Sequence, residues 1–176
     1  MSVADAPEDW DAPLETMWEG RFIKAQRRGR WEFAGRARGI RAAVILAELE
    51  GSAILVEQYR VPLGRTCLEL PAGLIGDDSE GETVEVAAAR ELEEETGYRA
   101  GRIEVVGDFF SSPGMISEGF TLVRAHDLVK VGEGGGVEGE GITVRLVPRA
   151  KLAEFIAERA AAGVAMDVKL LALLDL

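Results

Sequence analysis

Four glutamates stand together near the middle of the chain, within the five residues from 91 to 95. On a helix, like charges three or four positions apart cost about 0.2–0.5 kcal/mol per pair, and the C-terminal end of a helix prefers cations. Glu91, Glu94 and Glu95 would lie within about 100° of one another, on one face. Carboxylate oxygens gathered in this way suit a hard divalent cation such as Mg²⁺, and Arg90 could neutralise part of the cluster. We therefore expect a metal site at these glutamates.

The residues around the cluster predict the helix that would position it. Residues 84–96 contain neither Gly nor Pro and include three consecutive alanines, which favours a helix. Thr83 is a suitable N-cap, and Gly97 stands where helices often end in a left-handed residue. A run of carboxylates is usually a solvated helix face, so the spacing of the run must decide between that interpretation and a metal site.

The spacing resembles the Nudix box, G-x5-E-x7-R-E-U-x-E-E-x-G-U, in which U is a bulky apolar residue. Its seven fixed identities are matched by Gly76, Glu82, Arg90, Glu91, Glu94, Glu95 and Gly97. Leu92 and Tyr98 fit two of the apolar positions. So many fixed positions in one short window rarely arise by chance, so the resemblance favours a metal site over a solvated face.

The glycine that leads the box has two candidates. In the members of the family that this chain most resembles, the sequence P-A-G-L-I leads the box, and here that glycine is Gly73, with eight residues rather than five before Glu82. Either Gly76 is the equivalent residue, or a three-residue insertion within residues 76–80 lengthens the loop. The match of residues 68–73 to the flanking strand favours the insertion. The register of the helix from Glu82 onward is the same in both cases.

Two further segments resemble the branch of the family that hydrolyses ADP-ribose and other ADP-sugars. Residues 58–60 read Gln-Tyr-Arg, and the resemblance places Arg60 near the substrate phosphates, although an arginine at a strand end is usually a surface ion-pair residue. Residues 111–118 resemble a Ser-Pro-Gly loop whose glutamate, here Glu118, approaches the nucleophilic water. Glu118 is therefore a candidate general base, with a glutamate of the box such as Glu94 as the alternative.

The resemblance also implies contacts from the strand before the box and from the N-terminal segment. Ala72 would add its backbone carbonyl to the metal ligands, and Gly73 and Met115 would contact the substrate. Phe22 and Trp31 occupy places resembling aromatics that stack on adenine; the alternative is that they pack on the main domain. In that branch the N-terminal sheet reaches across a dimer, so a homodimer is expected.

The remaining pattern predicts an α/β chain. Residues 1–16 look like a loose arm, and residues 17–36 read as a hairpin around the basic turn 27–29. Near-continuous apolar runs predict two strands of a sheet covered on both faces. The strands that the sequence predicts after the hairpin are 40–49, 52–59, 104–110, 120–125 and 142–147, and the helices that follow are 149–162 and 166–174.

Those elements and the resemblance imply an α/β/α sandwich of Nudix type, an α+β arrangement around a mixed sheet, with a small N-terminal antiparallel sheet. Residues 1–39 would form the arm and the small sheet, and residues 40–176 the hydrolase domain. The Gly-rich residues 132–139 read as a linker rather than a site. Asp167 and Lys169, in the apolar tail, are expected to have no catalytic role.

Composition limits the classes of function. The 176 residues correspond to about one domain, and no apolar run approaches the roughly 20 residues that cross a bilayer, so no membrane is expected. A net charge of −11 argues against duplex nucleic acid, because phosphate binding relies on Lys and Arg clusters. It does not argue against a small phosphate compound held through a metal. One cysteine, Cys67, and an acidic N-terminus unlike a signal peptide predict a cytoplasmic protein.

The expected function is hydrolysis of the pyrophosphate bond of a nucleoside diphosphate sugar, with Mg²⁺, or Mn²⁺ in its place, as the cofactor. ADP-ribose, giving AMP and ribose 5-phosphate, is the substrate that the combined motifs favour. GDP-mannose and ADP-glucose remain open. An alternative of a different class is a non-catalytic Nudix module that senses ADP-ribose, but such a module is expected to have lost carboxylates of the box.

Overall fold

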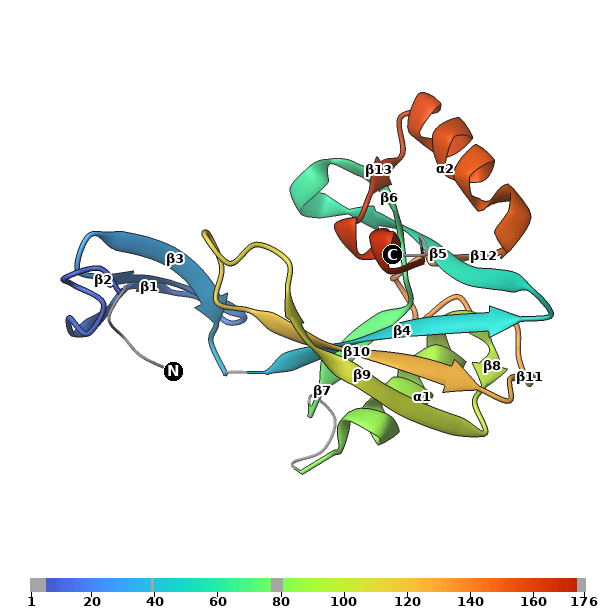
Figure 1. Cartoon of the computed structure of the whole chain (residues 1–176), viewed down its shortest axis with the longest axis horizontal. Helices are drawn as coiled ribbons and strands as arrows, with labels where there is room; N and C mark the ends of the chain where they lie inside the picture. The colour runs from blue at the N-terminus through green and yellow to red at the C-terminus, as the bar shows by residue number, and fades with distance from the viewer. Residues whose placement is uncertain (1–5, 39, 77–80, 174–176) are drawn as a thin grey trace.

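The computed structural model of the chain describes residues 6–38, 40–76 and 81–173 (Figure 1). Its strands are β1 (Leu14–Glu19), β2 (Ile23–Arg28), β3 (Trp31–Arg36), β4 (Arg41–Leu49), β5 (Ser52–Arg60), β6 (Arg65–Glu69), β7 (Ala72–Ile75), β8 (Tyr98–Arg99), β9 (Arg102–Phe110), β10 (Gly119–His126), β11 (Val129–Lys130), β12 (Thr143–Pro148) and β13 (Ala165–Met166). Its helices are η1 (Val61–Leu63), α1 (Val84–Thr96), η2 (Arg149–Lys151), α2 (Leu152–Ala161) and η3 (Val168–Leu173), where η marks a 3-10 helix. Most of the predicted insertion, residues 77–80, lies outside the described residues, as do the first five residues of the predicted arm.

A mixed sheet forms the body of the molecule. Its strand order is β13-β6-β5-β4-β10-β9, with β12 paired to β5 and β7 paired to β4. Strand β10 runs parallel to β4 and β13 runs parallel to β6, whereas the other pairs are antiparallel. Within the described residues, no helix is long and apolar enough to cross a bilayer.

The central strand β4 explains why both faces of the sheet are covered. Successive side chains of a strand point to opposite faces, and β4 is apolar on both. Val44 and Leu46 pack in a cluster that includes Leu152 of α2 and Leu170 of η3. The alternate β4 residues pack in a second cluster with Ala88 and Leu92 of α1. Helices therefore cover both faces of the mixed sheet, which confirms the predicted α/β/α sandwich.

The small N-terminal antiparallel sheet is confirmed, with one strand more than the predicted hairpin. Strands β1, β2 and β3 pair in that order and extend from one end of the body (Figure 1). The hairpin predicted over residues 17–36 has a single strand before its basic turn, and this was wrong, because the N–H of Gly20 donates to the carbonyl of Ile23 at 2.9 Å and closes a turn there. The last turn also lies at residues 29–30 rather than 27–29. The division into domains at residue 39, itself outside the described residues, stays a prediction.

The C-terminal region departs from the predicted pair of helices. Helix α2 is confirmed, but the second predicted helix, 166–174, is instead the short strand β13 followed by η3. Gly163, with a φ of +86°, turns the chain after α2. Met166 then pairs with Leu68 of β6, and the N–H of Asp167 donates to the carbonyl of Leu68 at 3.0 Å. Apolar spacing predicted helix here because it cannot show that a buried strand lies beside this segment.

Candidate active site

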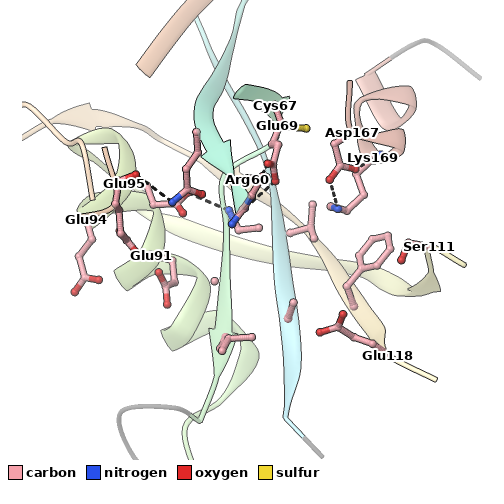
Figure 2. A pocket seen from close by; sticks show the side chains of 18 of the residues that line it. Arg60, Cys67, Glu69, Glu91, Glu94, Glu95, Ser111, Glu118, Asp167 and Lys169 are labelled. Carbon is pink, nitrogen blue, oxygen red and sulfur yellow. Dashed lines mark hydrogen bonds and ion pairs between the residues drawn. The ribbon is translucent and has the colours of Figure 1, made fainter. Parts of the chain in front are cut away.

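A cleft of about 720 Å³ lies between the acidic face of α1 and the loop that follows β9 (Figure 2). Eight of the residues named from the sequence line it: Arg60, Ala72, Gly73, Arg90, Glu91, Glu94, Glu95 and Glu118. The predicted substrate contacts Phe22, Trp31 and Met115 lie outside this cleft. Phe22 and Met115 are 59% and 67% exposed, and Trp31 borders a smaller hollow on the N-terminal sheet.

Helix α1 has the ends that the sequence predicts. The hydroxyl of Thr83 accepts a hydrogen bond from the N–H of Val86 at 3.4 Å, and Gly97 takes a φ of +72°, in the left-handed region. A residue with a Cβ atom would be strained in this conformation, whereas glycine adopts it freely. The change from right-handed to left-handed backbone at Gly97 ends the helix. The two caps set where the helix begins and ends, and therefore which glutamates face the cleft.

Arg90 links the carboxylates of this helix. Its Nη1 lies 3.0 Å from Glu91 Oε1 and 3.4 Å from Glu94 Oε2, and its Nε lies 3.3 Å from Glu82 Oε1. The hydrogen bond from Arg90 holds the pKa of Glu82 below its ordinary value. Arg90 thus offsets part of the repulsion among these three carboxylates.

Glu95 is the most deeply buried carboxylate of the cluster, 8% exposed. Its Oε2 accepts a hydrogen bond from the N–H of Ala72 at 3.1 Å. Burial, together with the charges of Glu91 and Glu140, raises the pKa of Glu95 to about 8 despite that hydrogen bond. Burial also raises the pKa of Glu91, and the charge and hydrogen bond of Arg90 offset only part of that rise. Both carboxylates would gain from a nearby cation.

Gly73 allows β7 to approach the helix closely. A Cβ atom built on Gly73 would lie 1.9 Å from Cδ of Glu91 and 2.1 Å from its Cγ. Any larger residue would therefore displace the carboxylate of Glu91 from this position. Gly76 has a different place: its N–H donates to Glu82 Oε2 at 3.2 Å, and its φ is +79°. The structure thus gives both glycines that the sequence left open a defined contact with the box.

The Gly-rich segment 132–139, which the sequence suggested was a linker, lies against the end of α1. The N–H groups of Gly135 and Gly136 donate to the carbonyls of Glu95 and Glu94 at 2.8 and 3.1 Å. These bonds satisfy carbonyls that the end of a helix leaves without partners. The segment also brings Glu140 into the cleft lining. Sequence reasoning missed Glu140, because it is one of three glutamates scattered in a Gly-rich run, where no helical or strand period indicates which of them faces a site.

The other end of the cleft is built from two segments distant in the sequence. The N–H of Ala34 in β3 donates to the carbonyl of Met115 at 2.9 Å, and the N–H of Ser117 donates to the carbonyl of Ala34 at 2.8 Å. The Ser-Pro-Gly loop is thereby attached to the N-terminal sheet. Glu118 then accepts a hydrogen bond from Nε of Arg36 at 2.5 Å. Arg36 also lines the cleft. The sequence did not indicate this, because the contact joins two segments that are far apart in the chain.

Arg60 lies between the two ends, held by Glu69. Its Nε and Nη2 donate to the two carboxylate oxygens of Glu69 at 2.6 and 2.8 Å, which fixes the plane of the guanidinium. The side chain of Arg60 remains 42% exposed toward the cleft.

Cys67 is buried, and burial together with Glu69 and Asp167 raises its pKa to about 12, so its thiol is not a nucleophile at neutral pH.

The carboxylates of the cleft fit a divalent cation by their chemistry. Oxygen donors are the ligands that Mg²⁺ prefers, and the raised pKa values of Glu91 and Glu95 reflect like charges and burial that a cation would relieve. Within residues 6–38, 40–76 and 81–173, no three His, Cys, Asp or Glu side chains already stand close enough to form a metal site. Arg90 draws Glu91 and Glu94 toward itself, so rotation of these side chains would have to accompany metal binding.

Comparison with known proteins places this arrangement in a family. A family model described as the NUDIX domain matches residues 37–166. A GDP-mannose pyrophosphatase of Cronobacter sakazakii is 37% identical over 148 residues, which cover 78% of this chain and 73% of that protein. An ADP-ribose pyrophosphatase of Bacillus subtilis is 43% identical over 86 residues, 49% of this chain and 45% of that protein.

A solved structure described as an ADP compounds hydrolase shares the fold. Its TM-score is 0.65 at 22% identity, and the match covers 86% of this chain and 92% of that one. The chain spans about half the length of several of the curated relatives that it matches. The family model and the Cronobacter sakazakii relative establish the family, and the substrate has to be inferred from the site.

Proposed function

The chain belongs to the Nudix family, and from that premise we propose that it is a pyrophosphohydrolase that cleaves a nucleoside diphosphate sugar with the help of Mg²⁺. The observation that supports this most directly is the composition of one cleft. The carboxylates Glu91, Glu94 and Glu95 line it together with the guanidinium groups of Arg60 and Arg36. Carboxylates suit a metal and guanidinium groups suit phosphate oxygens, so a diphosphate bound through a metal matches both.

The metal would be held by Glu91, Glu94 and Glu95, with the backbone of Ala72 beside them. When bound, Mg²⁺ or Mn²⁺ would neutralise phosphate charge and polarise phosphoryl oxygens. Ala72 already donates its N–H to Glu95, so β7 and α1 hold this side of the site together. Arg90 has the role of positioning Glu91 and Glu94 until the metal competes for them.

The other residues would orient the reactants. Arg60, fixed by Glu69, would bind a phosphate through the guanidinium N–H groups that Glu69 leaves accessible. A carboxylate would accept a proton from water as the water oxygen attacks one phosphorus and the bond from that phosphorus to the bridging oxygen breaks. Glu118 and a glutamate of the box are the candidates from the sequence, and Glu140 joins them because it lines the cleft. The products are two phosphomonoesters.

ADP-ribose is the substrate we favour, giving AMP and ribose 5-phosphate. The Gln-Tyr-Arg segment, the Ser-Pro-Gly loop and the Bacillus subtilis relative, an ADP-ribose pyrophosphatase, support it. GDP-mannose is the second candidate, because the GDP-mannose pyrophosphatase of Cronobacter sakazakii aligns over a larger share of both chains. Retention of the box carboxylates argues against the sensor without catalysis.

The test is hydrolysis of ADP-ribose, ADP-glucose and GDP-mannose by the purified protein, with Mg²⁺ and after chelation. We expect metal-dependent release of AMP and ribose 5-phosphate, lost in Glu94→Gln. Binding of ADP-ribose without turnover of any compound would favour a sensor instead. Glu118→Gln and Glu140→Gln then distinguish the candidate bases. The variant that lacks the base should have a kcat about 10²–10⁴-fold lower and should lose the limb of the pH profile that the base produces. A variant at a residue that is not the base should keep its kcat and its pH profile, and if both variants do so, a glutamate of the box is the base.

A homodimer is the second part of this proposal. Trp18 and Phe22 are more than half exposed on the N-terminal sheet, which extends from the body (Figure 1). Such exposed aromatics often mark interaction surfaces. A second copy could cover them and bring Phe22 or Trp31 to a cleft. Light scattering should give twice the monomer mass, and Phe22→Ser should lower it; a wild-type monomer would contradict the dimer.

The free, buried Cys67 agrees with the cytoplasm as the compartment.

A further inference from the structure

Asp167 and Lys169, expected from the sequence to lie apart from the chemistry, line the cleft. Figure 2 shows both on the side away from Glu91, Glu94 and Glu95, the side on which Ser111 and Glu118 also lie. Their side chains are only 15% and 19% exposed. A charged pair this far from water needs a reason, because a buried ion pair often adds little or nothing to stability.

The pair is fixed in place by the backbone on both sides. The N–H of Asp167 donates to the carbonyl of Leu68 in β6, and Oδ1 of Asp167 accepts from the N–H of Lys169 at 2.7 Å. The ammonium of Lys169 donates to the second oxygen, Oδ2. Both charged groups therefore stand at the cleft wall with little freedom to move, which lowers the entropy lost when a ligand binds.

The chemistry of the pair suits neutral hydroxyl groups better than phosphate. Asp167 and Lys169 together carry no net charge, yet they offer acceptor lone pairs beside the remaining N–H donors of the ammonium. Phe120, which also lines the cleft, lies with its ring centroid 5.9 Å from Nζ of Lys169 and stacks on Phe109. An acceptor and a donor beside an aromatic face match the alternating hydroxyl and C–H surfaces of a sugar.

We propose that Asp167, Lys169 and Phe120 form the subsite that recognises the terminal sugar of the substrate. The inference rests on the proposed function, because it takes the substrate to be a nucleoside diphosphate sugar. The phosphates are left to Arg60 and to the metal. Lys169 and Asp167 thereby determine which sugar is accepted, and the carboxylates of α1 serve the bond that is cleaved.

The test compares two non-hydrolysable ligands of equal charge by calorimetry in the presence of Mg²⁺: α,β-methylene-ADP carrying a methyl ester on its distal phosphoryl group, and the same compound carrying ribose in place of the methyl group. The ratio of their dissociation constants isolates the sugar. In the wild-type protein the ribosylated compound should bind more tightly. Lys169→Met and Asp167→Asn should each reduce this preference by about 10-fold to 100-fold, because each removes hydrogen bonds to or from a charged group. Phe120→Leu should reduce it less.

The first ligand also serves as the control for folding, since a variant that binds the methyl ester of α,β-methylene-ADP normally has an intact cleft. Lys151→Met, at an exposed lysine before α2, is the matched control and should keep the wild-type ratio. A ratio unchanged in Lys169→Met and Asp167→Asn, or a wild-type protein that binds both ligands equally, overturns the sugar subsite and leaves the proposed function standing. A wild-type protein that binds neither ligand contradicts the proposed function itself.

Discussion

Glu57 and Glu95 are buried to nearly the same degree, 5% and 8% exposed, and have opposite surroundings. Glu57, in β5, lies between two arginines: Nη2 of Arg145 donates to its Oε2 at 3.0 Å, and Nη2 of Arg159 donates to the same oxygen at 2.8 Å. Burial would raise the pKa of Glu57, but these hydrogen bonds outweigh it and hold the pKa below its ordinary value.

Glu95 has the reverse balance. Burial dominates, the neighbouring carboxylates Glu91 and Glu140 add to it, and the N–H of Ala72 offsets only part of the effect. One buried carboxylate thus has its counter-charge within the fold, joining β5 to β12 and α2. The other is held in a cleft where a cation would complete its surroundings. Exposure alone would not separate the ion-paired Glu57 from the proposed metal ligand Glu95, whereas the sign of the neighbouring charges does.

Removing the charge of Glu95 should have the strongest effect on activity. Glu95→Gln should lower kcat/KM by about 10²–10³-fold, the effect of losing one group that stabilises the transition state. Its amide oxygen can still accept from Ala72, so the free energy of unfolding without metal should be unchanged or higher. Steady-state kinetics and denaturant unfolding measure the two effects. Full activity in Glu95→Gln would remove Glu95 from the site.

Glu57→Gln should show the opposite pattern. It leaves Arg145 and Arg159 without a counter-charge, and breaking such a pair costs about 3 kcal/mol in the free energy of unfolding. The value of kcat should stay within about 2-fold, because Glu57 takes no part in the proposed site. Thermal and urea unfolding test the first statement. A large loss of kcat in a folded Glu57→Gln protein would mean that the two glutamates are not separate in function.

Mg²⁺ should stabilise the folded protein through the carboxylates of the cleft and not through Glu57. At a concentration about 100 times its Kd, the ion should add about 2.7 kcal/mol to the free energy of unfolding of the wild-type protein. The gain should be much smaller in Glu95→Gln and unchanged in Glu57→Gln. Thermal unfolding across a Mg²⁺ titration, with K⁺ as the ionic-strength control, gives this measurement. Equal gains in all three proteins would place the metal elsewhere.

Gly73→Ala would move the carboxylate of Glu91 without removing it. The added methyl group would overlap Glu91, so the side chain must rotate out of its position. We expect about a 10-fold loss of kcat/KM, because small displacements of positioned groups are costly. Gly132→Ala is the matched control, since a Cβ there meets only a distant Cα at 4.0 Å. Equal losses in both variants would point to a general effect on folding.

The smallest expected effect is the acid dependence that Glu57 gives to stability. Because its folded pKa is lowered, its contribution is fully present above the ordinary value of 4.5 and is lost as the pH falls through the lowered value. The difference in unfolding free energy between the wild-type protein and Glu57→Gln should therefore be constant above pH 4.5 and shrink below it. A difference that grew with acid would reverse the assigned sign.

The sequence predicted the box helix and its ends because each signal there is local. Thr83, the run of helix-forming residues and Gly97 act within a few positions of one another, and the spacing of Glu91, Glu94 and Glu95 follows from the helical period. The apolar runs of β4 and β5 predicted a sheet covered on both faces for the same reason. The segment 166–174 was misread because its state depends on pairing with β6, about a hundred residues earlier.

Local patterns in the sequence thus predicted the family, the central strands and the acidic face of α1. Contacts between distant segments are what bring Arg36, Glu140, Asp167 and Lys169 into one cleft with that face. The folded structure also distinguishes Glu57 from Glu95, which the sequence shows only as two residues of the same type. The physical reason is that a side chain's chemistry depends on the charges and burial around it, and those are set by contacts between segments far apart in the chain.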